Sequence, residues 1–124
     1  IPYGEEFVAC DLTGNGELDL VAGRYWLENT GDGDFLPHEI APAPGWIARV
    51  RVMDVNGNGR TDVVFVKEDV DYDQRVAAFV EVGWLENPGD PRSTPWPVHT
   101  IDTVRSPHSL DVADLDGDGR LEIW

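Results

Sequence analysis

The sequence has little that would indicate a disulfide-rich, membrane or nucleic-acid-binding protein. Its single cysteine, Cys10, cannot form an intrachain disulfide, and the apolar run FVAC favours a buried, inert thiol. No stretch comes near the ~20 apolar residues of a membrane-spanning helix, so no membrane span is expected. Basic residues are scarce: 9 Lys+Arg stand against 24 Asp+Glu, and the net charge of -15 argues against nucleic-acid binding.

Helical periodicity is also missing. No segment sustains a 3.6-residue apolar period or carries the caps of a helix of useful length. Instead, 13 glycines and 9 prolines separate short β-branched and aliphatic runs, such as ARVRVM (48–53) and DVVFV (62–66). The sequence therefore predicts an all-β fold with many short strands.

One ten-residue pattern occurs three times. The copies are DLTGNGELDL from Asp11, DVNGNGRTDV from Asp54 and DLDGDGRLEI from Asp114, spaced by 43 and 60 residues. Aligned, they read D-[LV]-[TND]-G-[ND]-G-x-[LT]-[DE]-[LVI], and each lies between strand-like runs. A second motif, WLEN followed by a glycine turn and a final strand, occurs within residues 25–40 and 83–101.

Each repeat therefore predicts four antiparallel strands, which is the content of one β-propeller blade. We expect blade one at about residues 4–43, blade two at about 44–104 and a partial blade three at about 105–124. Propellers close with roughly 4–8 blades. About two and a half blades imply a fragment of a longer protein, or one piece of an assembly in which a neighbouring chain completes blade three.

The loops have the composition of calcium sites. Calcium prefers 6–8 oxygen ligands, and alternate positions of a tight loop can supply them. Up to three Ca²⁺ ions are expected, and magnesium fits less well. The predicted ligands are Asp11, Thr13, Asn15, the Glu17 carbonyl and Asp19; Asp54, Asn56, Asn58, the Arg60 carbonyl and Asp62; and Asp114, Asp116, Asp118, the Arg120 carbonyl and Glu122. Four acids against two predict that the third loop binds most tightly.

The loops also invite two other interpretations, an EF-hand and a simple tight turn. An EF-hand needs a glutamate at loop position twelve, where the first two copies have Ala22 and Phe65, and it needs flanking helices. A simple tight turn also favours Asn, Asp and Gly. Three copies, each with an acid at position nine, favour a metal loop within a β-hairpin.

The three loops resemble the calcium loops of FG-GAP/VCBS-type β-propellers, the repeat class that also builds the integrin α-subunit head. The resemblance covers essentially the whole chain, and WLEN with its glycine turn is similar to the third-strand segment of bacterial VCBS-repeat proteins. It implies that each loop joins the first and second strands of a blade. The F-G and G-A-P signatures are absent, and Thr13 replaces an acid or amide.

Several aromatic and polar residues recur in matching places. The matched pairs predict structural roles, and they are Trp26 with Trp84, His38 with His99, and Glu28 with Glu86. Trp46 and Trp96 lie in proline-rich loops and are candidates for ligand contact. His108 is expected at a blade surface, and the acidic insert EDVDYDQR (68–75) at a solvated loop tip.

The first functional hypothesis is a calcium-binding module for adhesion or for binding a protein or glycan ligand, with calcium mainly structural. The alternatives are the propeller part of a secreted polysaccharide-degrading enzyme, or a structural subunit of an extracellular assembly. No nucleophile elbow, phosphate loop or zinc spacing occurs, so nothing requires catalysis. An extracellular, cell-surface or periplasmic location is expected, because calcium is plentiful there.

Overall fold

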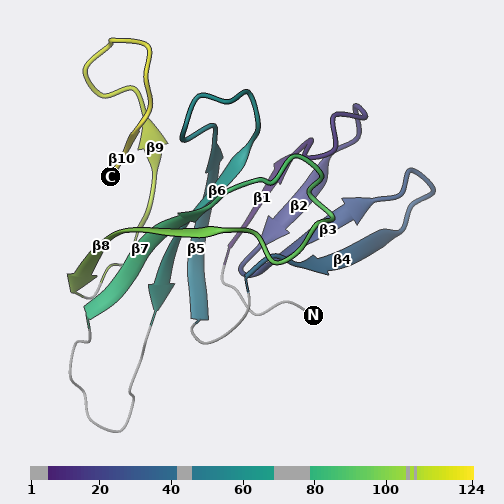
Figure 1. Ribbon diagram of the computed structural model, residues 1–124, viewed down its shortest axis with the longest axis horizontal. Coiled ribbons are helices and arrows are strands. Elements are labelled where there is room, and N and C mark those ends of the chain that lie inside the picture. The colour runs from purple at the N-terminus through teal and green to yellow at the C-terminus, as the bar shows by residue number, and fades with distance from the viewer. Residues whose placement is uncertain (1–5, 42–45, 69–78, 106, 108) are drawn as a thin grey trace, which may run out of the picture.

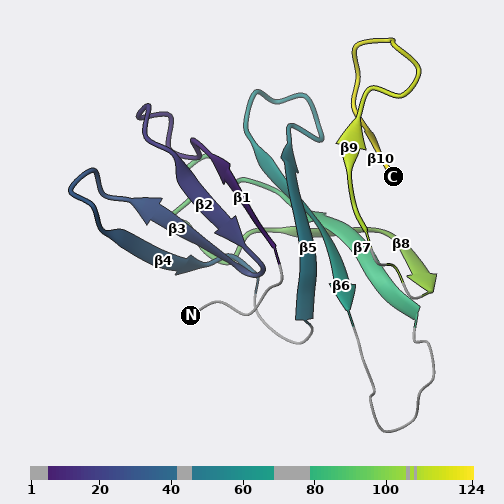
Figure 2. The same ribbon diagram turned by 180° about the vertical axis from the view of Figure 1, so that it is seen from behind.

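The structure is a computed structural model that describes residues 6–41, 46–68, 79–105, 107 and 109–124 (Figures 1 and 2). These residues form ten strands and no helix, so they contain no helix long and apolar enough to cross a membrane. All strand pairs are antiparallel. The prediction of an all-β fold is confirmed.

The strands form two four-stranded sheets and one two-stranded sheet, each a simple meander. The chain is therefore a partial β-propeller whose third blade contains two strands. The first sheet comprises β1 (Phe7–Cys10), β2 (Asp19–Ala22), β3 (Tyr25–Asn29) and β4 (Phe35–Glu39). The second comprises β5 (Trp46–Met53), β6 (Asp62–Glu68), β7 (Phe79–Leu85) and β8 (Val98–Arg105), and the third β9 (Val112–Ala113) and β10 (Glu122–Ile123).

The three glycine-rich loops close three hairpins in the same register. Position nine of each loop pairs with the residue before position one: Asp19 with Cys10, Asp62 with Met53, and Glu122 with Ala113. Each loop therefore joins the first and second strands of its sheet. Figure 1 shows all three loops projecting from the same edge of the molecule.

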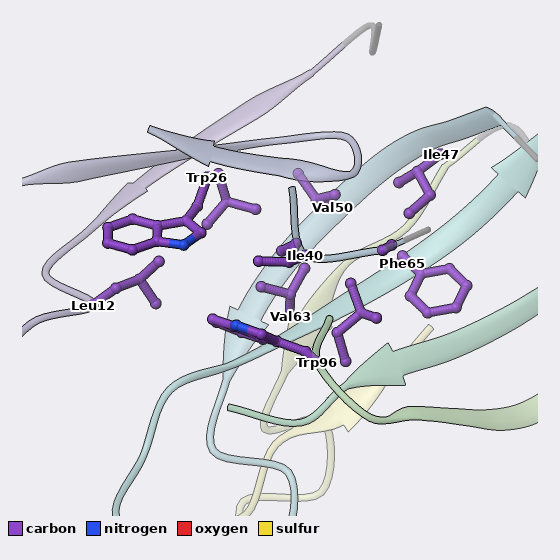
Figure 3. Packing of buried hydrophobic residues seen from close by; sticks show 11 residues of the cluster. Leu12, Trp26, Ile40, Ile47, Val50, Val63, Phe65 and Trp96 are labelled. Carbon is purple, nitrogen blue, oxygen red and sulfur yellow. The ribbon is translucent and has the colours of Figure 1, made fainter. Parts of the chain in front are cut away.

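The core lies between the sheets, because alternate residues of a strand point to opposite faces. On β6, Val63 and Phe65 face the first sheet and belong to a core cluster that includes Trp26, Ile40 and Trp96 (Figure 3). Val64 and Val66 of the same strand face the other way, into a second cluster with Leu110 and Ile123. The middle sheet thus packs on both faces, closely against the first sheet and in part against the third.

Candidate metal-binding loops

Each loop is shaped by the aspartate at its first position. The carboxylate of Asp54 accepts the backbone N–H groups of Gly57, Asn58 and Gly59 at 2.8, 3.1 and 2.7 Å. Asp11 and Asp114 accept the matching three amides in their own loops. The amide of Gly16 is the main reason that the pKa of Asp11 lies below its ordinary value. In each loop the backbone therefore curls around the carboxylate at the first position.

Positive φ angles allow this curl. Gly57 and Gly59 have φ angles of 73° and 83°, and the matching glycines of the other two loops are similar. Residues with a Cβ rarely adopt this conformation. The glycine spacing that identified the repeat is therefore a requirement of the loop backbone.

Positions three and five turn their side-chain oxygens toward the backbone. The Oδ1 of Asn58 accepts the N–H of Arg60 at 2.9 Å, and Asn15 and Asp118 do the same for their loops. At position three, Asn56 and Asp116 accept the next amide but one. Thr13 differs, because its hydroxyl donates to Asp11 at 3.5 Å. The threonine thus departs from the pattern in the structure as well as in the sequence.

Position nine is a buried hydrogen-bond centre in the first two loops. Asp19 and Asp62 are each 0% exposed. The two oxygens of Asp62 accept the N–H groups of Val55 at 3.0 Å and of Asn87 at 2.9 Å. Asp19 does the same for Leu12 and Asn29. This aspartate therefore ties its loop to the WLEN strand, and its predicted role as a ligand stays a prediction.

The asparagine of WLEN completes this tie, and sequence reasoning missed its role. The Nδ2 of Asn87 donates to the carbonyl of Thr61 at 3.1 Å, and its Oδ1 accepts the N–H of Gly89 at 3.0 Å. Asn29 makes the matching bonds to Leu18 and Gly31. The signal was the repetition of asparagine before each glycine turn.

The third loop brings carboxylates together. Carboxylate oxygens of Asp114, Asp116 and Glu122 lie within 4.8 Å of one another, a spacing that one metal ion could bridge. Among the residues that the structure describes, this is the one group of three or more acidic, histidine or cysteine side chains with that geometry. Asp118 lies outside the group, with its Oδ1 on the amide of Arg120. Three of the four predicted acids therefore converge.

Electrostatics in the second loop disfavour negative charge. Burial is the main reason that the pKa of Asp62 is raised, and the carboxylates of Asp54 and Glu86 raise it further by smaller amounts. The two amide hydrogen bonds lower it, but they do not cancel these effects. A cation in the loop would lower this cost, since opposite charge favours the ionised carboxylate. The arrangement of this loop thus suits a bound cation.

The matched aromatic and polar pairs have the same geometry in both complete blades. His38 stacks on Trp26 with ring centroids 4.5 Å apart, and its Nε2 lies 2.9 Å from Glu28. His99 stacks on Trp84 at 4.3 Å and bonds Glu86 at 2.7 Å. The Arg92 guanidinium, ahead of His38, holds the pKa of Glu28 below its ordinary value. The prediction of structural roles for these pairs agrees with this repeated packing.

The prediction that Trp96 contacts a ligand is wrong. Its side chain is 1% exposed, lies in the core between the first two sheets (Figure 3), and donates its indole N–H to the Pro91 carbonyl at 2.9 Å. The side chain of Trp46, His108 and residues 69–75 of the acidic insert lie outside the described residues.

Burial raises the pKa of the Cys10 thiol to about 11, which fits an inert thiol.

Comparison with known families agrees with the repeat seen in the sheets. A protein-family model described as an FG-GAP-like repeat matches the chain twice, over residues 11–65 and 69–124. No curated protein and no solved structure gives a significant match. The two family matches together contain all three glycine-rich loops.

Proposed function

The chain belongs to the FG-GAP-like repeat family, and from this premise we propose that it is a calcium-stabilised β-propeller segment that acts as a binding or adhesion module. The observation that carries the proposal is the convergence of Asp114, Asp116 and Glu122 in one loop. Three carboxylates on a backbone that is already curled supply the hard oxygen donors that calcium prefers. The first two loops offer fewer acids on the same backbone.

Calcium would act mainly as a structural ion. An ion that binds only the folded loops adds its binding free energy to the stability of the fold. It would also offset part of the net charge of -15, which opposes a compact state through self-repulsion. The role of Asp62 and Asp19 as buried hydrogen-bond acceptors supports this view, because both sit where the loop meets the rest of its sheet.

Thermal unfolding of the chelated chain, followed by addition of metal, tests this proposal. The midpoint is expected to rise with Ca²⁺, because a ligand at 100 times its Kd adds about 2.7 kcal/mol of stability. Mg²⁺ is the matched control and is expected to act more weakly, since it keeps more of its water. Isothermal titration then counts the sites. The absence of both binding heat and a midpoint shift at millimolar Ca²⁺ would overturn the proposal.

Binding of a protein or glycan would use the loops that project from one edge of the molecule (Figure 1). An array of glycans, probed with and without chelator, tests the glycan arm of this proposal. Calcium-dependent signal on a glycan class supports it, and a uniformly blank array removes that arm. The proposed location is extracellular, at the cell surface or in the periplasm, where calcium would keep the loops occupied.

The alternative of a polysaccharide-degrading enzyme draws no support from Glu28 and Glu86. Glycoside hydrolysis needs two carboxylates that face one substrate. Glu28 is instead bound by His38 and Arg92, and Glu86 by His99 and Asn56. Glu86 is thus held within its own blade, and Glu28 is held by its own blade and by the connection that reaches it from the second sheet.

A further inference from the structure

Each complete sheet presents the same surface to the repeat that follows it. We name this surface the receiving face. It comprises Trp26, Glu28, His38 and Ile40 in the first sheet, and Trp84, Glu86, His99 and Ile101 in the second. The stacked indole and imidazole and the glutamate–histidine bond have the same geometry on both faces.

The first receiving face is occupied. The connection between β7 and β8 leaves the second sheet and crosses to the first, where Figure 1 shows it as the green segment that passes over β1 to β3. The Pro91 carbonyl accepts the indole N–H of Trp26 at 3.1 Å. The guanidinium of Arg92 binds both oxygens of Glu28, with its Nε 3.1 Å from Oε2. The backbone N–H of Trp96 donates to the Ile40 carbonyl at 3.0 Å.

The second receiving face has the same groups but is much more open. The side chains of Glu28 and His38 are 12% and 17% exposed, whereas those of Glu86 and His99 are 31% and 44% exposed. Ile40 is fully buried, and Ile101 is 50% exposed. Trp84 packs only partly, at the border of the cluster that contains Ile123 of β10.

Hydrogen bonding differs in the same way. Within the described part of the chain, the indole N–H of Trp84 has no hydrogen-bond acceptor, and Glu86 is bonded by His99 and Asn56 and by no lysine or arginine. The Nδ2 of Asn56 donates to Glu86 at 3.2 Å. The glutamate of the second face is thus bonded by a neutral amide, whereas that of the first face is bonded by a guanidinium.

We propose that the second receiving face docks the corresponding connection of a following repeat: a proline-containing turn that presents a backbone carbonyl to Trp84, an arginine to Glu86 and a tryptophan over Ile101. Charge complementarity selects a cationic partner, because Glu86 is acidic and half-open. The repeat indicates the shape of this partner, because the connection between β7 and β8 has the same chemistry and covers the matching face of the first sheet. The inference rests on the propeller architecture and is independent of calcium.

A peptide of residues 88–97, PGDPRSTPWP, is the probe, because this sequence fills the first face. The unlabelled peptide is titrated into the ¹⁵N-labelled chain, and the indole N–H signal of Trp84 is followed after assignment with Trp84→Phe. A saturable shift of this signal is expected, in chelator as well as in Ca²⁺. A peptide with Arg92→Gln should bind at least ~10-fold more weakly, the loss expected for a charge-assisted bidentate pair.

Variants of the protein test whether the peptide binds at Glu86. Glu86→Gln should weaken the binding of the peptide, whereas Glu81→Gln should leave it unchanged. Glu81 is the matched control, because it lies on β7, which Glu86 directly follows, but bonds Lys67 and Thr100. The substituted peptide needs no change in the protein, so it remains decisive if Glu86→Gln fails to fold.

Three results would overturn the inference. The first is no saturable shift of Trp84 at millimolar peptide, and the second is equal binding of the arginine and glutamine peptides. The third is a concentration-dependent shift of Trp84 without peptide, which would make a second copy of this chain the occupant. Loss of calcium binding in the thermal experiment would leave all three readouts intact, so the two proposals fail separately.

Discussion

The first two glycine-rich loops and the third share one backbone design, but they differ in what supports position nine. Asp19 and Asp62 are fully buried and bind the backbone of the WLEN asparagine. Glu122 lies on a two-stranded sheet and accepts only the amide of Leu115 at 2.7 Å among the described residues. The loops with the most structural support thus carry the fewest carboxylates. One loop position can therefore hold a hairpin against its sheet or join a cluster of acids.

The largest effect on stability is expected when the buried aspartate at position nine is replaced. Asp62→Ala leaves the half-buried amide of Val55 and the buried amide of Asn87 without their acceptor, at a cost of about 1–3 kcal/mol for each group. A loss of about 2–6 kcal/mol in the free energy of unfolding is expected. Urea unfolding in chelator measures it without any contribution from metal. Asp118→Ala, in the exposed third loop, is the control and should cost under ~1 kcal/mol. Equal losses would contradict the comparison.

The next largest effect is expected at the WLEN asparagine, whose backbone N–H bonds the aspartate at position nine. Asn87→Ala removes the bond to Thr61 and leaves the Gly89 amide without its acceptor, so a loss of about 1–3 kcal/mol in unfolding free energy is expected. Asn29→Ala should cost less, because Asn87 is 3% exposed and Asn29 is only half-buried. Urea unfolding of the two variants side by side checks the order. A larger loss for Asn29→Ala would show that burial does not set the cost.

The sequence predicted these loops well because their determinants are local. Gly57 and Gly59 need positive φ angles, and Asp54 binds amides three to five residues away. Such requirements leave a fixed spacing in the sequence. The four strands of each blade follow from the same kind of local pattern, in which β-branched runs end at glycine or asparagine.

Contacts between repeats could not be predicted in this way. Trp96 lies in a proline-rich stretch that reads as an exposed loop, yet it is buried against Ile40, 56 residues earlier in the chain. Its burial depends on the connection crossing to a different sheet, and no local pattern encodes which sheet that is. The same limit explains why Asn87 was missed, since its partner Thr61 lies across the sheet on another strand end.

A smaller effect ranks the loops as calcium sites. Asp116→Ala removes one acid of the converging three, whereas Asn56→Ala removes a neutral oxygen from the same position of the second loop. More carboxylates bind calcium more tightly. In isothermal titration, the tightest Ca²⁺-binding event is therefore expected to disappear in Asp116→Ala and to remain in Asn56→Ala. The reverse result would place the tightest site in a supported loop and contradict the ranking.

The smallest effect tests whether the third hairpin opens on its own. A Cβ at Gly57 or at Gly117 meets no atom within 4 Å, so alanine at either position costs only the strain of a positive φ, about 1–2 kcal/mol. Gly57 belongs to a loop tied to its sheet, so Gly57→Ala should lower global stability by that amount. Gly117 belongs to a hairpin with two residues in each strand. A unit with so few contacts opens locally before the fold unfolds, so Gly117→Ala should leave the urea midpoint unchanged in chelator and speed amide exchange only in residues 112–123. Equal shifts of the urea midpoint would show that the third hairpin is already as firmly coupled as the other two, without an ion.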